Sequence, residues 1–122
     1  MKFFMLFGAM NGFLAVALGA FGAHGLEGKI SEKALGAWEK AVTYQMFHTV
    51  ALFVIGFLMA KMETVSIMWA GIFFSIGIVL FSGSLYVYAT TGVKQLAMIT
   101  PFGGVFFLIG WIILGYVIIR FV

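Results

Sequence analysis

Apolar residues fill four long stretches of this chain, and charged residues occur only between or beside them. The stretches without Asp, Glu, Lys or Arg cover residues 3–26, 41–60, 64–93 and 95–119, which are 24, 20, 30 and 25 residues long. An α-helix rises about 1.5 Å per residue, so about 20 residues cross the roughly 30 Å hydrocarbon core of a bilayer. All four stretches reach that length, and the pattern therefore predicts four transmembrane helices.

Membrane-spanning strands would alternate polar and apolar positions, and a closed barrel needs at least about eight of them. The four stretches show no such alternation. We therefore expect an all-α polytopic membrane protein in which residues 1–122 form a single domain. Its expected architecture is a bundle of four transmembrane helices plus a short interfacial helix between helices 1 and 2.

Small residues recur at steps of four and three along the first helix, which is expected over roughly residues 3–23. The row consists of Gly8, Gly12, Ala15, Gly19 and Gly22. Small residues on one face let two helix backbones approach closely in lipid, where van der Waals packing drives association. We expect this row to contact another helix, and we assign the same packing role to Gly103 and Gly104. The alternative is that a membrane helix merely tolerates these glycines.

The only stretch with dense charge is residues 27–40, EGKISEKALGAWEK, between the first and second helices. Ser31 is a suitable N-cap, and apolar residues then recur at steps of three and four. We expect a short interfacial helix here that runs into the second transmembrane helix, expected over residues 41–60. Trp38 is expected at the depth of the lipid headgroups, where tryptophan is frequent.

The ends of the third and fourth helices are less sharply marked. The third begins near Val65 and is expected to stop near residues 89–92, ATTG, because 30 helical residues exceed the bilayer thickness. For the fourth helix, Thr100 can act as the N-cap with Pro101 at the first helical position. The alternative is one continuous helix from residue 95 with a kink at Pro101.

Composition supports the membrane assignment and narrows the chemistry. The chain is 64% hydrophobic and 9% charged with a mean hydropathy of +1.18, whereas soluble domains are about 25% charged. The net charge of +3 is spread over several loops and forms no basic patch for nucleic acid. The chain has no cysteine, and two histidines without an intramembrane carboxylate are a poor set of metal ligands. We therefore expect no metal, no cofactor and no nucleic-acid partner.

We expect the protein to lie in the cell (inner) membrane. An even number of crossings places both termini on the same side of that membrane. Lys2 before an apolar stretch also resembles the start of a signal peptide, but 24 uninterrupted residues favour a retained helix. The side of the termini carries three basic residues and the opposite side four, so the positive-inside rule gives no orientation.

Polar residues of the helices gather in the half of the membrane next to the 27–40 segment, if each residue adds about 1.5 Å of depth. This expected polar region, a candidate binding site, consists of His24, Trp38, Tyr44, Gln45, His48, Ser82, Ser84, Tyr86 and Thr100. Asn11 lies outside it, near the midplane. An unpaired polar group in hydrocarbon costs several kcal/mol, so these side chains are expected to face protein. The alternative to a binding role is hydrogen-bonded packing and capping.

His48 shares one helical face with Tyr44 and Gln45 and lies about 12 Å inside Lys40. We expect it to face protein and to be neutral at pH 7, because no carboxylate in the membrane stretches holds it charged. We expect its hydrogen-bond partner on the third or fourth helix, in the stretch 82–86. His24 is expected to belong to the same region.

Four ordered motifs resemble a known family: GAFGAHGL, a tryptophan with YQMFHTVAL, FSGSLYVY, and ITPFGG followed by GW. They resemble the small membrane proteins grouped as domain of unknown function 423, which include the transmembrane protein 256-like proteins. The resemblance covers essentially the whole chain and implies a multi-pass protein of four helices without an assigned activity. The motif positions are Gly22, His24, Gly25, Trp38, Tyr44, His48, Gly83, Ser84, Tyr86, Pro101, Gly103, Gly104 and Trp111.

Three classes of function are compatible with these features. The first is a non-enzymatic membrane protein, a homo-oligomer whose one-sided polar cavity holds a lipid headgroup or a small amphipathic ligand. The second is a channel or transporter subunit for a small solute, which usually needs polar groups along the whole path. The third is an intramembrane enzyme with a histidine base, for which Ser84 and His48 lack an acidic partner. We favour the first, with membrane lipid as the partner and no catalytic residue assigned; the sequence identifies no protein partner.

Overall fold

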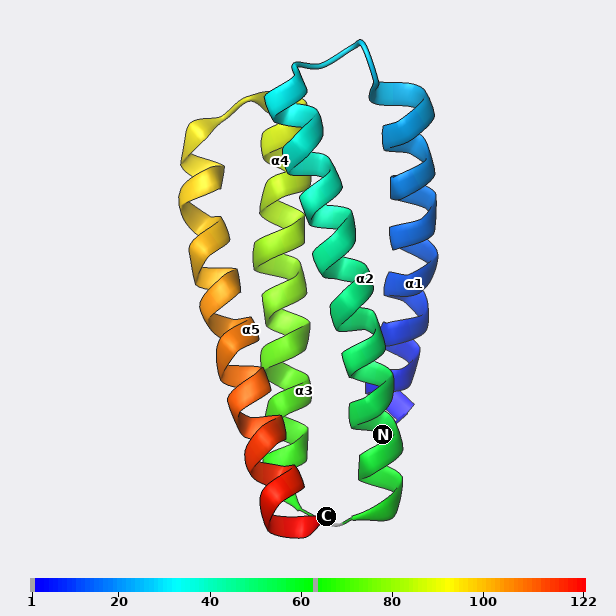
Figure 1. Cartoon of the computed structure of the whole chain (residues 1–122), viewed down its shortest axis with the longest axis vertical. Coiled ribbons are helices and arrows are strands. Elements are labelled where there is room, and N and C mark those ends of the chain that lie inside the picture. Colours follow the sequence, from blue (N-terminus) through cyan, green and yellow to red (C-terminus); the bar gives the residue numbers. More distant parts are fainter. Residues whose placement is uncertain (1, 63) are drawn as a thin grey trace.

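Helices account for the architecture of the computed structural model, which describes residues 2–62 and 64–122. Within these residues the chain folds into α1 (Lys2–Phe21), the π-helical segment η1 (Gly22–Leu26), α2 (Glu32–Lys61), α3 (Val65–Gly77), the π-helical segment η2 (Ile78–Gly83), α4 (Ser84–Thr91) and α5 (Lys94–Phe121). The elements α3, η2 and α4 follow one another as one long helix (Figure 1).

The described residues form four helices that are long and apolar enough to cross a membrane. They cover Lys2–Leu26, Glu32–Lys61, Val65–Thr91 and Lys94–Phe121. The predicted all-α fold with four transmembrane helices is therefore confirmed. The start of α1 and the end of α5 lie at the same end of the molecule (Figure 1).

Capping residues explain where several helices begin and end. The Ser31 hydroxyl accepts a hydrogen bond from the Ala34 backbone N–H at 3.1 Å, as expected of an N-cap. The segment expected as an interfacial helix forms the first turns of α2, which continues to Lys61 without a break. Gly92 ends α4 with a left-handed backbone (φ 71°), a conformation that glycine adopts without strain.

The expected start of the fourth transmembrane helix at Pro101 is wrong. α5 begins at Lys94 and includes Pro101 in its interior, and Thr100 does not cap it. A proline inside a helix loses one backbone hydrogen bond. Continuing the helix through Pro101 gives the other backbone groups of residues 94–100 helical partners, which matters wherever this stretch lies within hydrocarbon.

The helices pack as two pairs that share a core. α1 lies along α2, and α5 lies along α3 and η2, so α1 and α5 are at opposite edges of the bundle (Figure 1). The buried core includes Leu52 and Ile55 of α2, Phe74 of α3 and Phe107 of α5. From α1, Phe4 joins this core near the end of the molecule where the chain begins.

The small residues of α1 lie where this helix approaches α2. A Cβ atom at Gly19 would lie 3.3 Å from Val42, and one at Gly22 would lie 2.5 Å from the Trp38 ring. Along the seam between η2 and α5, a Cβ at Gly103 would lie 2.7 Å from the backbone Cα of Phe81. By contrast, a Cβ at Gly104 would lie 3.9 Å from its nearest neighbour, the Phe81 ring, which is an ordinary van der Waals contact.

Candidate functional site: a polar path beside a pocket

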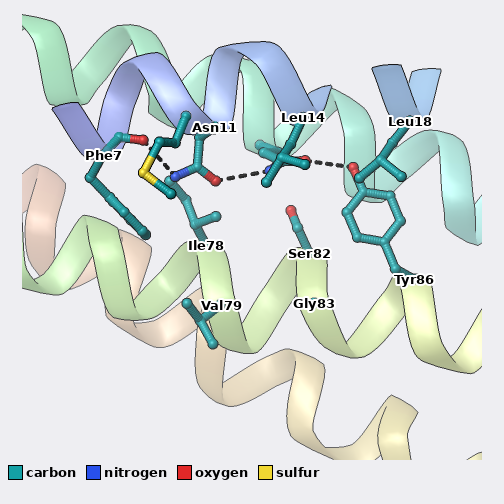
Figure 2. Close-up of a pocket in the computed structure, with 11 residues that line it drawn as sticks. Phe7, Asn11, Leu14, Leu18, Ile78, Val79, Ser82, Gly83 and Tyr86 are labelled. Carbon is teal, nitrogen blue, oxygen red and sulfur yellow. Dashed lines mark hydrogen bonds between the residues drawn. The ribbon is translucent and has the colours of Figure 1, made fainter. Parts of the chain in front are cut away.

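A pocket of about 300 Å³ lies between α1 on one side and η2 with the start of α4 on the other (Figure 2). Its back is formed by α2 through Gln45. The residues that line it are Phe7, Met10, Asn11, Leu14, Leu18, Gln45, Ile78, Val79, Ser82, Gly83 and Tyr86. Most of these side chains are apolar, and the polar ones are neutral at pH 7.

A chain of hydrogen bonds runs along this pocket and connects three transmembrane helices. The Tyr86 hydroxyl donates to Gln45 Oε1 at 2.6 Å, and Gln45 Nε2 donates to Asn11 Oδ1 at 2.8 Å. Asn11 Nδ2 in turn donates to the Phe7 carbonyl at 2.8 Å. Because that carbonyl can only accept, it fixes the orientation of the Asn11 amide and then of the Gln45 amide. The path therefore has one direction, from Tyr86 to α1.

The backbone around Gln45 is held from two neighbouring positions. The Thr49 hydroxyl donates to the Gln45 carbonyl at 2.7 Å, within α2. One turn earlier, the Ser82 hydroxyl of η2 donates to the Ala41 carbonyl at 2.7 Å. Gln45 and Ser82 are 4% and 1% exposed, so both bonds lie in the protein interior. They hold α2 and η2 together at the level of the pocket.

His48 lies one turn further along α2, in an aromatic layer against α5. Its ring stacks on Phe107 with centroids 3.5 Å apart and planes 8° from parallel. The Trp111 indole N–H donates to His48 Nε2 at 3.0 Å, and His48 Nδ1 lies 2.8 Å from the Tyr44 carbonyl. An indole nitrogen can only donate, so Nε2 accepts and Nδ1 carries the proton that is donated to Tyr44. The imidazole in this arrangement is neutral.

His48 thus faces protein and bonds a residue of the fourth transmembrane helix, which is one of the two helices named from the sequence. The expected stretch 82–86 is wrong, because the partner is Trp111 on α5. Helix periodicity predicts that His48 lies on an inward face of α2. It does not determine how α5 is rotated relative to α2, and therefore does not predict which residue of α5 bonds His48.

The other predicted site residues divide among separate places. Ser84 and Thr100 bond each other at 2.6 Å and join α4 to α5. Trp38 is buried and donates to the Leu18 carbonyl at 2.8 Å, which ties α2 to α1. Tyr44 is 41% exposed, and His24 is an exposed residue of η1. Within the described structure, no side-chain hydrogen bond links His24 to His48 or to the pocket.

Asn11, Thr49 and Trp111 take part in these networks but were not among the predicted site residues. Asn11 was placed outside the polar region because of its depth, yet it lines the pocket and receives the bond from Gln45. A solitary amide in an apolar helix is itself a signal, since it requires a partner. Trp111 is a motif position of the family resemblance, but the sequence gives no sign that it bonds His48, which lies 63 positions away.

The chain is similar to known membrane proteins over nearly its full length. A UPF0382 membrane protein of Staphylococcus epidermidis strain RP62A is 52% identical over 121 residues, which are 99% of this chain and 98% of that protein. The UPF0382 membrane protein YwdK of Bacillus subtilis strain 168 is 49% identical over 122 residues, 99% of both chains. No solved structure matches.

The family model described as "protein of unknown function (DUF423)" matches residues 18–104. The match includes Gln45, His48, Ser82 and Tyr86, whereas Asn11 and Trp111 lie outside it. The relatives are about 50% identical to this chain over nearly their full length. Together with the family match, this shows that the chain is a membrane protein of the DUF423 family.

Proposed function

We propose that this protein is a non-enzymatic membrane protein whose pocket between α1 and η2 binds a small amphipathic molecule or the polar part of a lipid. The observation that carries the proposal is the hydrogen-bonded path of Tyr86, Gln45 and Asn11 along the wall of an open pocket. Pockets that bind small molecules typically combine apolar walls with a few convergent polar groups.

The polar groups of the path have hydrogen-bonding capacity to spare. A side-chain amide has two N–H donors, and the described structure uses one from Asn11 Nδ2 and one from Gln45 Nε2. The Tyr86 hydroxyl donates one bond and keeps the acceptor sites of its oxygen. A ligand in the pocket can therefore be bound without breaking the bonds that hold the helices.

The rim of the pocket supports entry from the membrane. Met10, Leu14 and Val79 line the pocket and are 54%, 43% and 59% exposed. All three lie within the membrane-spanning stretches, where an exposed side chain contacts lipid. A molecule dissolved in the bilayer thus has a direct route between α1 and η2.

The irregular backbone at the pocket is a further support. η2 interrupts the α-helical pattern of the third span over Ile78–Gly83, and four of its residues line the pocket. π-Helical segments within an α-helix change the directions of its side chains and occur frequently at functional sites. Here the segment lets Ser82 bond α2 while Val79 borders the opening.

Two glycine variants test the proposal. A Cβ atom added at Gly83 or at Gly115 would meet no atom within 4 Å, but of these two glycines only Gly83 lines the pocket. The protein is purified in a mild detergent, and the lipids that remain bound are identified by native mass spectrometry. We expect wild type and Gly115→Leu to retain a bound amphiphile and Gly83→Leu to lose it. Equal retention in all three proteins would contradict the proposal.

We further propose that the protein forms a homo-oligomer in the cell membrane with both termini on one side. The common end of α1 and α5 supports the placement of the termini (Figure 1). The mass of the particle in lipid nanodiscs tests the homo-oligomer, for which a single copy per particle is the contrary result.

A further inference from the structure

We propose that the ligand of this pocket is an uncharged lipid with one hydrogen-bonding segment, such as an ester carbonyl beside a hydroxyl, and that it enters from the hydrocarbon side. This inference rests on the proposed function and narrows it to a chemical class. It depends on the charge, the hydrogen-bonding pattern and the size of the pocket.

The charge of the lining excludes an ionised headgroup. None of the 11 described residues that line the pocket is Asp, Glu, Lys, Arg or His. An anionic or cationic group that moved from the membrane surface into this site would lose its hydration without gaining a counter-charge. Burying such a charge costs several kcal/mol in real proteins. A neutral polar group loses much less and can recover that loss through hydrogen bonds.

The hydrogen-bonding pattern selects the neutral group. The unused N–H donors belong to Asn11 and Gln45, which are adjacent in the path. An ester or ketone carbonyl on the ligand accepts such bonds. The Tyr86 hydroxyl lies next to Gln45, on the side away from Asn11, and its oxygen accepts from a ligand hydroxyl (Figure 2). A pure hydrocarbon satisfies neither set and gains only contact with the apolar wall.

The size of the pocket decides how much of the lipid enters. Its volume of about 300 Å³ lies at the lower end of the range of about 300–1,000 Å³ for pockets that bind small molecules. A whole membrane lipid is far larger, so the polar segment and the first carbons occupy the pocket. The rest of an acyl chain passes Met10 and Val79 into the surrounding bilayer.

Three photoactivatable probes with the same diazirine-bearing chain test this assignment: a monoacylglycerol, the corresponding lysophosphatidic acid, and the plain hydrocarbon. The acylglycerol and its phosphate differ only by the charged group. Each is added at equal concentration to the full-length protein in nanodiscs of neutral phosphatidylcholine. After irradiation, labelling is measured on the peptides that contain Met10 and Val79.

We expect the monoacylglycerol to label these peptides at least about tenfold more than either other probe, which corresponds to about 1.4 kcal/mol. Gly83→Leu is expected to abolish that excess, and Gly115→Leu is expected to keep it. Equal or stronger labelling by lysophosphatidic acid or by the hydrocarbon, still blocked by Gly83→Leu, would overturn the uncharged-lipid assignment and leave pocket binding intact. If Gly83→Leu and Gly115→Leu label alike with every probe, the proposed binding function itself fails.

Gln45→Met supplies a second test, because methionine has a similar length but no amide. In this variant we expect the preference for monoacylglycerol over hydrocarbon to disappear. A preserved preference in a folded Gln45→Met protein would contradict the role of the amide. If the variant does not fold, the comparison of the three probes on wild type decides the assignment.

Discussion

The bond between Trp111 and His48 shows how one contact determines the state of a buried residue. Nε2 of His48 must accept, because the indole offers only a donor, and this leaves Nδ1 as the protonated atom. The ring is only 3% exposed and is stacked on Phe107. A charged imidazolium here would place two N–H donors opposite each other. The layer is therefore built for a neutral histidine.

We predict that Trp111→Phe lowers the free energy of unfolding by about 1–2 kcal/mol, because it leaves the buried His48 Nε2 without a donor. Trp69→Phe is the control, since Trp69 is 48% exposed and its indole nitrogen makes no hydrogen bond within the described structure. Melting temperature in the same detergent compares the two. A fall in melting temperature for Trp69→Phe as large as that for Trp111→Phe would refute this role of the bond.

At this scale the sequence reveals which residues need partners but not which partners they find. The inward, hydrogen-bonded placement of His48 was predictable from the cost of a bare polar group in hydrocarbon. Its pairing with Trp111 was not, because it depends on how α5 is rotated and shifted along α3. For the same reason, Asn11 was assigned to no partner although Gln45 bonds it.

Glycines of α5 allow a close backbone approach to the third transmembrane helix, which consists of α3, η2 and α4. Gly103 faces the backbone of Phe81, and Gly110 lies 2.8 Å, measured from an added Cβ, from the Phe74 ring. A backbone neighbour cannot rotate away as a side chain can. The Ser84 to Thr100 bond lies beside this contact and joins the same two helices.

Gly103→Ala is expected to destabilise the protein by about 1–3 kcal/mol, since the new methyl group would force α5 away from η2. At Gly104, one position along, an added Cβ would make only an ordinary van der Waals contact, so Gly104→Ala is expected to change stability by less than about 0.5 kcal/mol. Thermal or denaturant unfolding of both variants measures the difference. Similar stabilities for the two variants would show that this seam is not tightly packed.

The helix lengths were largely predictable, because charged residues and Ser31 mark most ends and a bilayer requires unbroken helices. The start of α5 was not, since Thr100 and Pro101 form a plausible N-terminus in sequence alone. In the structure the Thr100 hydroxyl bonds Ser84, and the helix continues through the proline. The π-helical segments η1 and η2 also have no distinct sequence signal, because their residues are ordinary helix formers and glycines.

For the whole molecule, the arrangement of four spans determines where loops and termini can lie. α1 begins and α5 ends at the end of the bundle where α2 ends at Lys61 and α3 begins at Val65 (Figure 1). The charged segment between η1 and α2 lies at the opposite end. A membrane around the four apolar spans therefore separates these two sets of residues.

Reporter fusions that are active on only one side of the membrane test this topology. We predict that a fusion at Arg120 and one after Lys61 report the same side, and that a fusion near Lys33 reports the other. Opposite signals from the Arg120 and Lys61 fusions would contradict four crossings.

The most direct test of the central claim is a crystal structure of the protein crystallised together with lipids from its own membrane. The predicted result is elongated non-protein density that enters between Met10 and Val79 and ends within hydrogen-bond distance of the Asn11 and Gln45 amides. The opposite result is a pocket closed by movement of α1 toward η2, or one filled by a side chain of a second copy, with no lipid density at Gln45.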